Sequence, residues 1–210
     1  MFAPGIECDF TNHPILEPSF LYGAYPCKEL RNKFLMAQSC CCNPLSEADL
    51  PDGLRMIPLP GHFFDMTGFR TCDDVVFLAD CLSSRETLSK YRIPFIYDTA
   101  AYLDTLSRVQ KMQARFFIPS HAEACEDISA LAQYNIDVVM EIAETILSFC
   151  GQPKNWEQLL SILFLHYGLH MNMQQYVLVG STVRSFLSWL KDKGELRAFF
   201  ENEMLLWETI

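Results

Sequence analysis

Three polar side chains that could bind a metal ion each follow a short apolar stretch. His62 comes after MIPLPG, Asp80 ends VVFLAD, and His121 ends FFIPSH. Two imidazoles and one carboxylate offer lone pairs at neutral pH and suit zinc, iron or manganese. A single histidine after a strand is as well explained as a turn residue, so the prediction of a metal site depends on all three side chains coming together.

The segments that would position these residues follow a layered α/β pattern. Short apolar or alternating stretches predict strands, and apolar residues at helical spacing predict one helix, with Asp98 as its N-terminal cap. The strands are expected at 54–60, 67–71, 75–80 and 114–121, and the helix at 98–112. Polar residues stand at the strand ends, where the rim of a sheet in a layered domain carries chemistry.

The two ends of the chain have a different character. Proline residues in the first 53 residues predict irregular structure, with one short helix at 28–35. The last part predicts three amphipathic helices and then a hairpin that turns at Glu201-Asn202-Glu203. The helices are expected at 136–151, 155–168 and 172–194. Three helices and a hairpin follow the order of a winged helix, so we expect domains at 1–130 and 131–210.

Composition limits the partners. The chain has 210 residues, 50% of them hydrophobic, and a formal net charge of -10, which disfavours binding to phosphate backbones and anionic membranes. Residues 128–210 hold five Lys or Arg against nine Asp or Glu, a balance that disfavours nucleic acid as a partner of the helical tail. No apolar run is long enough to span a membrane, and the first residues do not resemble a signal peptide. Nine scattered cysteines without a C-x-x-C pair indicate free thiols in a cytoplasmic protein.

Three segments resemble a known family. LPGHFFDMTGF, VVFLADCL and FIPSHAEA are similar to the third, fourth and fifth metal-binding motifs of the metallo-β-lactamase superfamily, over residues 55–123. The tail resembles the winged-helix appendix of some hydrolases of that superfamily. The resemblance implies half of an αββα sandwich in which His62 binds a first metal, Asp80 bridges two metals and His121 binds the second. It also implies zinc, with iron or manganese as alternatives, and hydrolysis of a small-molecule ester, lactone, thioester or phosphodiester.

The chain departs from the family pattern at four places. Family glycines are replaced by Asp65, Ala79 and Ser120. The opening His-x-His-x-Asp-His signature, which supplies two ligands to each metal, has no counterpart, and His13 is the only histidine before His62. We therefore expect an incomplete dinuclear site in a truncated or divergent superfamily member.

The missing signature leaves a second interpretation open. The chain is then a catalytically inactive remnant that acts as an oligomeric or interaction module. Without the first half of the sandwich, the apolar strands around Val75 and Phe116 would leave one face uncovered. An exposed apolar face favours self-association, so we expect a homo-oligomer or a partner protein.

Other polar or aromatic groups allow two interpretations. Phe63 and Phe64 could wall a substrate pocket beside His62 or pack in the core. The pair Asp73-Asp74 is better explained by a hairpin turn than by acid–base chemistry. Two further groups could in principle hold a metal but are better explained as structural, and these are His166 with His170 and the triplet Cys40-Cys41-Cys42.

Overall fold

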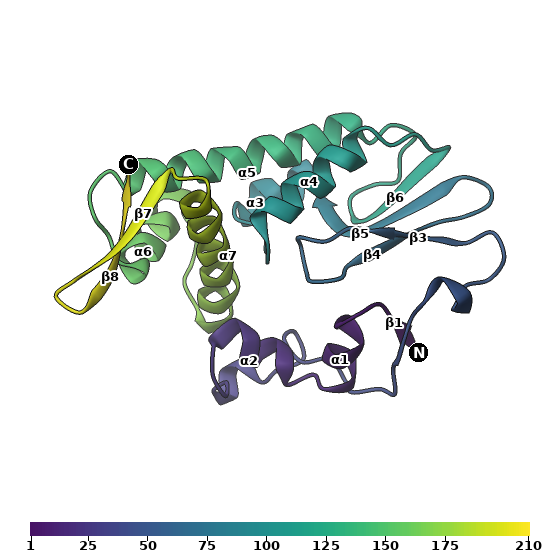
Figure 1. Ribbon diagram of the computed structural model, residues 1–210, viewed down its shortest axis with the longest axis horizontal. Coiled ribbons are helices and arrows are strands. Elements are labelled where there is room, and N and C mark those ends of the chain that lie inside the picture. The colour runs from purple at the N-terminus through teal and green to yellow at the C-terminus, as the bar shows by residue number, and fades with distance from the viewer.

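A four-stranded sheet forms the centre of the first part of the chain (Figure 1). The computed structural model describes all residues, 1–210. The strands lie in the order β3-β4-β5-β6, with β6 parallel to β5 and the other neighbours antiparallel. Their bounds are β3 Arg55–Pro58, β4 Thr67–Arg70, β5 Val75–Ser83 and β6 Phe116–His121. The four predicted strands are confirmed, and β5 extends past Asp80.

Helices cover one face of this sheet. The buried residues Val76, Leu78 and Phe117 point to that face, where α4 (Thr99–Gln110) and α5 (Ser129–Phe149) pack. The predicted cap of α4 is confirmed, because the Asp98 side chain accepts a hydrogen bond from Ala101 N at 3.0 Å. The helix α3 (Arg85–Tyr91) was not predicted, since Leu88 is its only buried residue and its apolar period is too weak to recognise.

The other face of the sheet is partly open. Phe77 and Phe69 are register partners on β5 and β4, and the Phe77 side chain is 42% exposed. No helix covers these two rings, whereas α4 and α5 cover the opposite, buried face of the sheet. The exposure is consistent with the expected uncovered face, while self-association through it stays a prediction.

The C-terminal part has the predicted order of elements. After α5 come α6 (Trp156–Tyr167), α7 (Met173–Asp192), β7 (Leu196–Glu201) and β8 (Met204–Thr209). Asn155 and Asn172 cap α6 and α7, and Asn202 and Glu203 form the hairpin turn with positive φ. One core of 29 buried residues runs from Leu59 to Leu196, so both parts of the chain share it through α5. The division at residue 130 stays a prediction.

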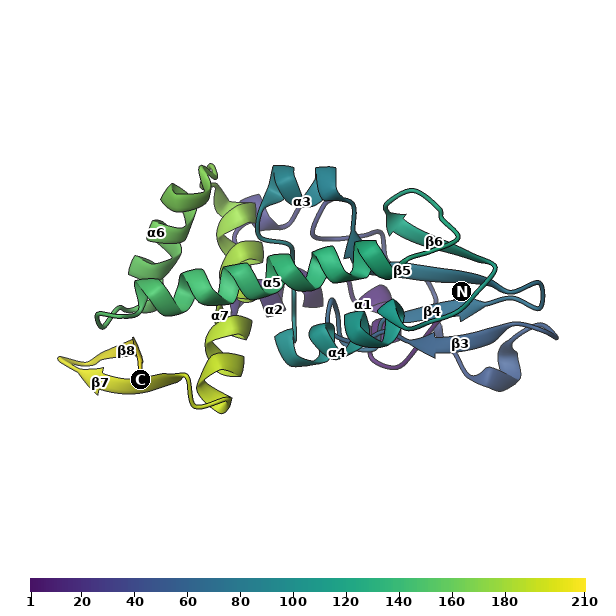
Figure 2. The same cartoon turned by 90° about the horizontal axis from the view of Figure 1, so that it is seen from above.

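Residues 1–53 form an N-terminal arm that runs from the sheet to α7 (Figures 1 and 2). Short elements alternate with turns, as the prolines predict. These elements are β1 Phe2–Ala3, α1 Glu7–Asn12, α2 Leu16–Tyr22, β2 Asn43–Pro44 and two 3₁₀ turns at Lys28–Leu30 and Glu47–Asp49. The helix predicted at 28–35 is wrong, because the chain makes one 3₁₀ turn at Lys28–Leu30 and then a separate turn instead of a continuous helix. None of the helices combines the length and apolarity that crossing a membrane requires.

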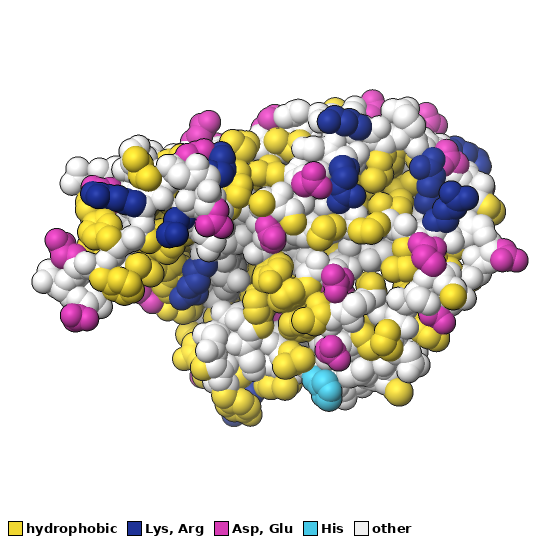
Figure 3. Space-filling model, in the orientation of Figure 1, with side chains coloured by type: hydrophobic (Ala, Val, Ile, Leu, Met, Phe, Trp, Pro, Cys, Tyr) yellow, Lys and Arg dark blue, Asp and Glu magenta, His cyan; other side chains and the backbone are white.

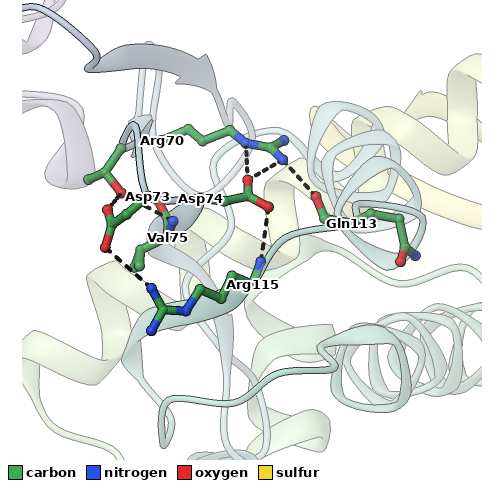
Figure 4. Close-up of polar contacts among 7 residues, drawn as sticks. Arg70, Asp73, Asp74, Val75, Gln113 and Arg115 are labelled. Carbon is green, nitrogen blue, oxygen red and sulfur yellow. Dashed lines mark hydrogen bonds and ion pairs between the residues drawn. The ribbon is translucent and has the colours of Figure 1, made fainter.

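The aspartate pair before β5 is structural (Figure 4). Asp74 has a φ of 67° in the turn between β4 and β5 and forms an ion pair with Arg70. Asp73 accepts a hydrogen bond from Thr71 Oγ1 at 2.6 Å and lies 3.9 Å from the Arg115 guanidinium. These bonds hold the hairpin together, which confirms the turn and gives the pair no catalytic task.

The loop after β3 fits tightly against the first turn of α4. Gly61 has a φ of +119°, and a Cβ added there would lie 2.2 Å from Tyr102 N. The Gly61 carbonyl accepts hydrogen bonds from Tyr97 N and Asp98 N, each at 3.0 Å. Thr105 Oγ1 donates to the Pro60 carbonyl at 2.8 Å. Only glycine fits at this position, and this explains the Pro-Gly pair before His62.

We expect Gly61→Ala to lower the free energy of unfolding by about 3 kcal/mol or more, since it adds a backbone clash to a positive φ. Gly168→Ala is the matched control, because Gly168 has a φ of +64° and open space around it. That change should cost only about 1 kcal/mol. Urea unfolding of both variants checks the difference, and equal losses would contradict the close approach.

Candidate metal centre

His62 lies in the loop that Gly61 presses against α4. Its Nε2 atom is 4.0 Å from Asp80 Oδ2, and its ring meets the Phe95 ring edge to face at 5.5 Å. Burial lowers the pKa of His62, and His121 acts in the same direction, against the opposing effects of Asp80 and the Phe95 backbone. The imidazole is therefore held in the neutral form, which is the form that binds metals.

Asp80 sits on an irregular part of β5. The pairing of β5 with β6 shifts register on both sides of Ala79, which has a φ of 48°. This left-handed residue turns the strand and directs Asp80 to the rim of the sheet. Ala79 occupies a position where the family pattern has glycine, and the backbone conformation explains that preference.

His121 is the last residue of β6 and pairs with Ser83 of β5. Its Nε2 atom lies 3.5 Å from the same Asp80 oxygen, Oδ2, that faces His62. Because β5 and β6 are parallel neighbours, Asp80 and His121 reach the same rim. The structure thus brings all three predicted residues together around one carboxylate oxygen.

The chemical types of the three donors suit a metal ion, but their arrangement in space suits it less well. Two neutral imidazoles and a carboxylate are the usual ligands of catalytic zinc, which takes three protein ligands and an open position. Within the whole chain, no group of three or more His, Cys, Asp or Glu side chains is arranged to hold a metal ion. The two imidazoles each approach Asp80, but the three donors do not form a closed set.

A cavity of about 730 Å³ opens beside the two histidines and includes Tyr102, which sequence reasoning missed. The Tyr102 side chain is 2% exposed, and burial raises its pKa well above the usual value, with Cys81 and Asp80 contributing. No residue of the chain forms a hydrogen bond with its hydroxyl. Tyr102 was missed because it occupies an apolar position of α4, where a tyrosine is usually a core residue.

Phe63 and Phe64 do not line this cavity. They pack against the N-terminal arm, with Phe10 and Phe63 at 4.9 Å between ring centroids and Phe20 and Phe64 at 5.3 Å. Phe64 also lies 3.9 Å from the Tyr97 ring. This aromatic cluster ties the arm to the His62 loop, and a pocket role for the pair stays a prediction.

Asp65 fastens the same loop to α1. Its Oδ2 atom accepts a hydrogen bond from Ile6 N at 3.0 Å, and Glu7 Oε1 accepts one from Asp65 N at 3.0 Å. A Cβ at Gly5 would lie 1.9 Å from Asp65 Oδ2, so the arm passes directly over this carboxylate. The aspartate that replaces a family glycine therefore has a structural task.

Solved structures decide the fold. A metallo-beta-lactamase family protein from Thermus thermophilus superposes with a TM-score of 0.67 at 16% identity, over 96% of this chain and 67% of that one. The chain has the metallo-β-lactamase fold. A beta-lactamase domain protein from Burkholderia ambifaria superposes with a TM-score of 0.60 at 17% identity, over 85% of this chain and 56% of that one.

The metallo-β-lactamase fold is identified by structure alone. No family model matches the sequence, and no curated protein matches it either. The chain spans about two thirds of the Thermus protein and just over half of the Burkholderia protein. The resemblance predicted from three short motifs is thus confirmed at the level of the fold.

We expect Ala79→Gly to stabilise the protein by about 0.5–1 kcal/mol, because relief of the left-handed conformation exceeds the added chain entropy. Ala130→Gly is the control, since Ala130 is a residue of α5 outside the buried core and the change should destabilise by a similar amount. Thermal unfolding measures both. A loss of stability in Ala79→Gly would show that the bulge does not strain this residue.

The Glu7 carboxyl predicts a pH-dependent stability. Burial raises the pKa of Glu7 from 4.5 to about 7; the hydrogen bond from Asp65 N opposes this shift, while the charges of Asp65 and Glu17 add to it. Between these two values the folded chain keeps a proton that the unfolded chain has lost, so stability falls as the pH rises from 5 to 8. Glu7→Gln keeps an acceptor for Asp65 N and removes the charge.

We therefore expect Glu7→Gln to exceed the wild type by about 1–2 kcal/mol at pH 8 and to match it at pH 5. Glu47→Gln is the control, because Glu47 also accepts a backbone hydrogen bond, from Met56 N at 3.2 Å, but is exposed. Urea titrations at the two pH values test this. If the two variants changed the free energy of unfolding with pH in the same way, burial of Glu7 would be disproved as the cause.

Proposed function

We propose that the chain is a metal-dependent hydrolase of the metallo-β-lactamase superfamily whose dinuclear centre is incomplete. One observation carries the proposal, namely that His62 and His121 both approach Asp80 Oδ2, at 4.0 and 3.5 Å. The three side chains come from separate segments and meet at the rim of the sheet, where they are partly exposed and open to a ligand.

Each of the three residues would have a different role, which its surroundings determine. His62 is held neutral by burial and presents Nε2 toward Asp80, while Asp80 supplies the negative charge. His121 is half-exposed and lies on the solvent side of the cluster. When bound, a zinc, iron or manganese ion would supply Lewis acidity that brings the pKa of water toward 7. Tyr102 would donate a hydrogen bond into the cavity from its free hydroxyl.

Small molecules are the proposed substrates, as esters, lactones, thioesters or phosphodiesters. Nucleic acid is a poor candidate, because Lys and Arg side chains are interspersed with Asp and Glu over the surface in Figure 3. We further propose a cytoplasmic location, which is consistent with nine cysteines that are all free thiols.

The second candidate function is a catalytically inactive interaction module. The lack of any group of three side chains arranged to hold a metal ion favours it, together with the exposed Phe77 on the open sheet face. In this case the three strand-end residues are the remains of a ligand set. The C-terminal helices and hairpin then act as a winged-helix-like packing module.

We expect the purified chain to bind zinc, iron or manganese, and His62→Ala/His121→Ala to lose at least nine tenths of it. The double variant removes both imidazoles and leaves one carboxylate, which cannot hold the ion alone. Elemental mass spectrometry after dialysis measures the content. His13→Ala/His166→Ala is the control, because neither residue belongs to the cluster.

Equal metal content in the two double variants, or none in the wild type, would reject the hydrolase. In the second case, a dimer seen by light scattering would support the interaction module.

A further inference from the structure

The cavity beside the candidate metal centre has one apolar wall and few charges. It is about 730 Å³, which is in the range of small-molecule sites. The wall comes from α3, the loop after it and α7, and consists of Leu88, Ile93, Pro94, Phe95, Leu178 and Val179. His62 and His121, which approach the same Asp80 oxygen, line the same cavity, and their side of it is called the polar end below.

The charged groups of the cavity do not suit a phosphate. Lys90 is its only cation, and Glu86, one turn earlier on α3, lies in the same lining. Phosphodiesters and nucleotides need several converging cations or backbone N–H donors, and a single exposed lysine beside a carboxylate provides neither. The wall instead favours a ligand whose bulk is hydrocarbon.

The polar end suits a carbonyl group. Tyr102 has a side chain that is 2% exposed and lines the cavity, with a hydroxyl that no residue of the chain engages. The hydroxyl opens to the cavity, because the structure has no fully buried side-chain N or O atom without a partner, and it can donate to a ligand oxygen placed beside it. Tyr102 packs against Gly61, the residue before His62. The cavity therefore offers a hydrogen-bond donor at one end and hydrocarbon contact along its wall.

We propose that this cavity binds the acyl part of carboxylic esters or thioesters with an unbranched aliphatic chain. The proposal rests on the proposed hydrolase function and narrows its substrate class to acyl compounds. The carbonyl lies at the end with His62, His121 and Tyr102, and the alkyl chain lies along Leu178 and its neighbours.

Binding of the carboxylic acid product tests the proposal without turnover. Octanoate, butyrate and adenosine 5′-monophosphate are titrated into the metal-free protein, followed by NMR of its labelled methyl groups. Each buried methylene contributes about threefold to fourfold in affinity. Octanoate is therefore expected to bind at least tenfold more tightly than butyrate and to shift the methyl signals of Ile93 and Leu178.

Two variants locate the binding. Leu178→Asp should weaken octanoate at least tenfold, and Leu165→Asp is its control, since Leu165 is 80% exposed on α6 and outside the cavity. Gln175→Leu lengthens the apolar wall and should tighten octanoate about threefold. A gain of affinity cannot come from unfolding, so this variant keeps the test valid if Leu178→Asp does not fold.

Equal affinity for octanoate and butyrate, or tighter binding of the nucleotide, would overturn the acyl cavity. Elemental analysis of the protein as purified, before its metal is removed for the titrations, reports separately on the hydrolase. Chain-length-dependent binding without any metal would thus reject the hydrolase and retain the cavity, while metal uptake without such binding would do the reverse.

Discussion

The packing of Gly61 against the first turn of α4 is the constraint on which the candidate site depends. A side chain at this position would lie 2.2 Å from Tyr102 N, and the Gly61 carbonyl is bonded to Tyr97 N and Asp98 N. This single close contact fixes the loop that holds His62 and also places Tyr102 in the wall of the cavity. The site residue on the loop and the hydroxyl on the helix are therefore positioned together.

The N-terminal arm gives the same loop a second support from the other side. Asp65 accepts a hydrogen bond from Ile6 N and donates one to the Glu7 carboxyl, and rings of the arm pack on Phe63 and Phe64. In a metallo-β-lactamase fold that spans only part of the solved structures it resembles, such contacts matter. They cover apolar surface that would otherwise face water and hold His62 in place.

The rim of the sheet and the C-terminal helices together form the candidate site. β5 and β6 bring Asp80 and His121 to one edge, and α7 closes the cavity beside them with Leu178 and Val179. The C-terminal part shares the main core with the sheet and also lines the cavity. A change in the packing of α7 would alter the cavity that adjoins His62 and His121.

The sequence by itself determined the local elements and the kinds of side chain at the strand ends. Asp98 caps α4 as predicted, because capping depends on a hydrogen bond to a backbone group within the same turn. The four strands were predictable for a similar reason, since a short apolar or alternating stretch is a pattern of neighbouring residues. The three motifs also indicated the fold, although no match to a family model supports them.

Only the tertiary structure decided which residues meet. That His62 and His121 approach one oxygen of Asp80 depends on a register shift at Ala79 and on the parallel pairing of β5 and β6. The place of the Tyr102 hydroxyl in the cavity could not be predicted, because it depends on contacts between residues far apart in the chain. Long-range packing selects among conformations that local propensity leaves nearly equal in energy, and for that reason the cavity was visible only in the folded chain.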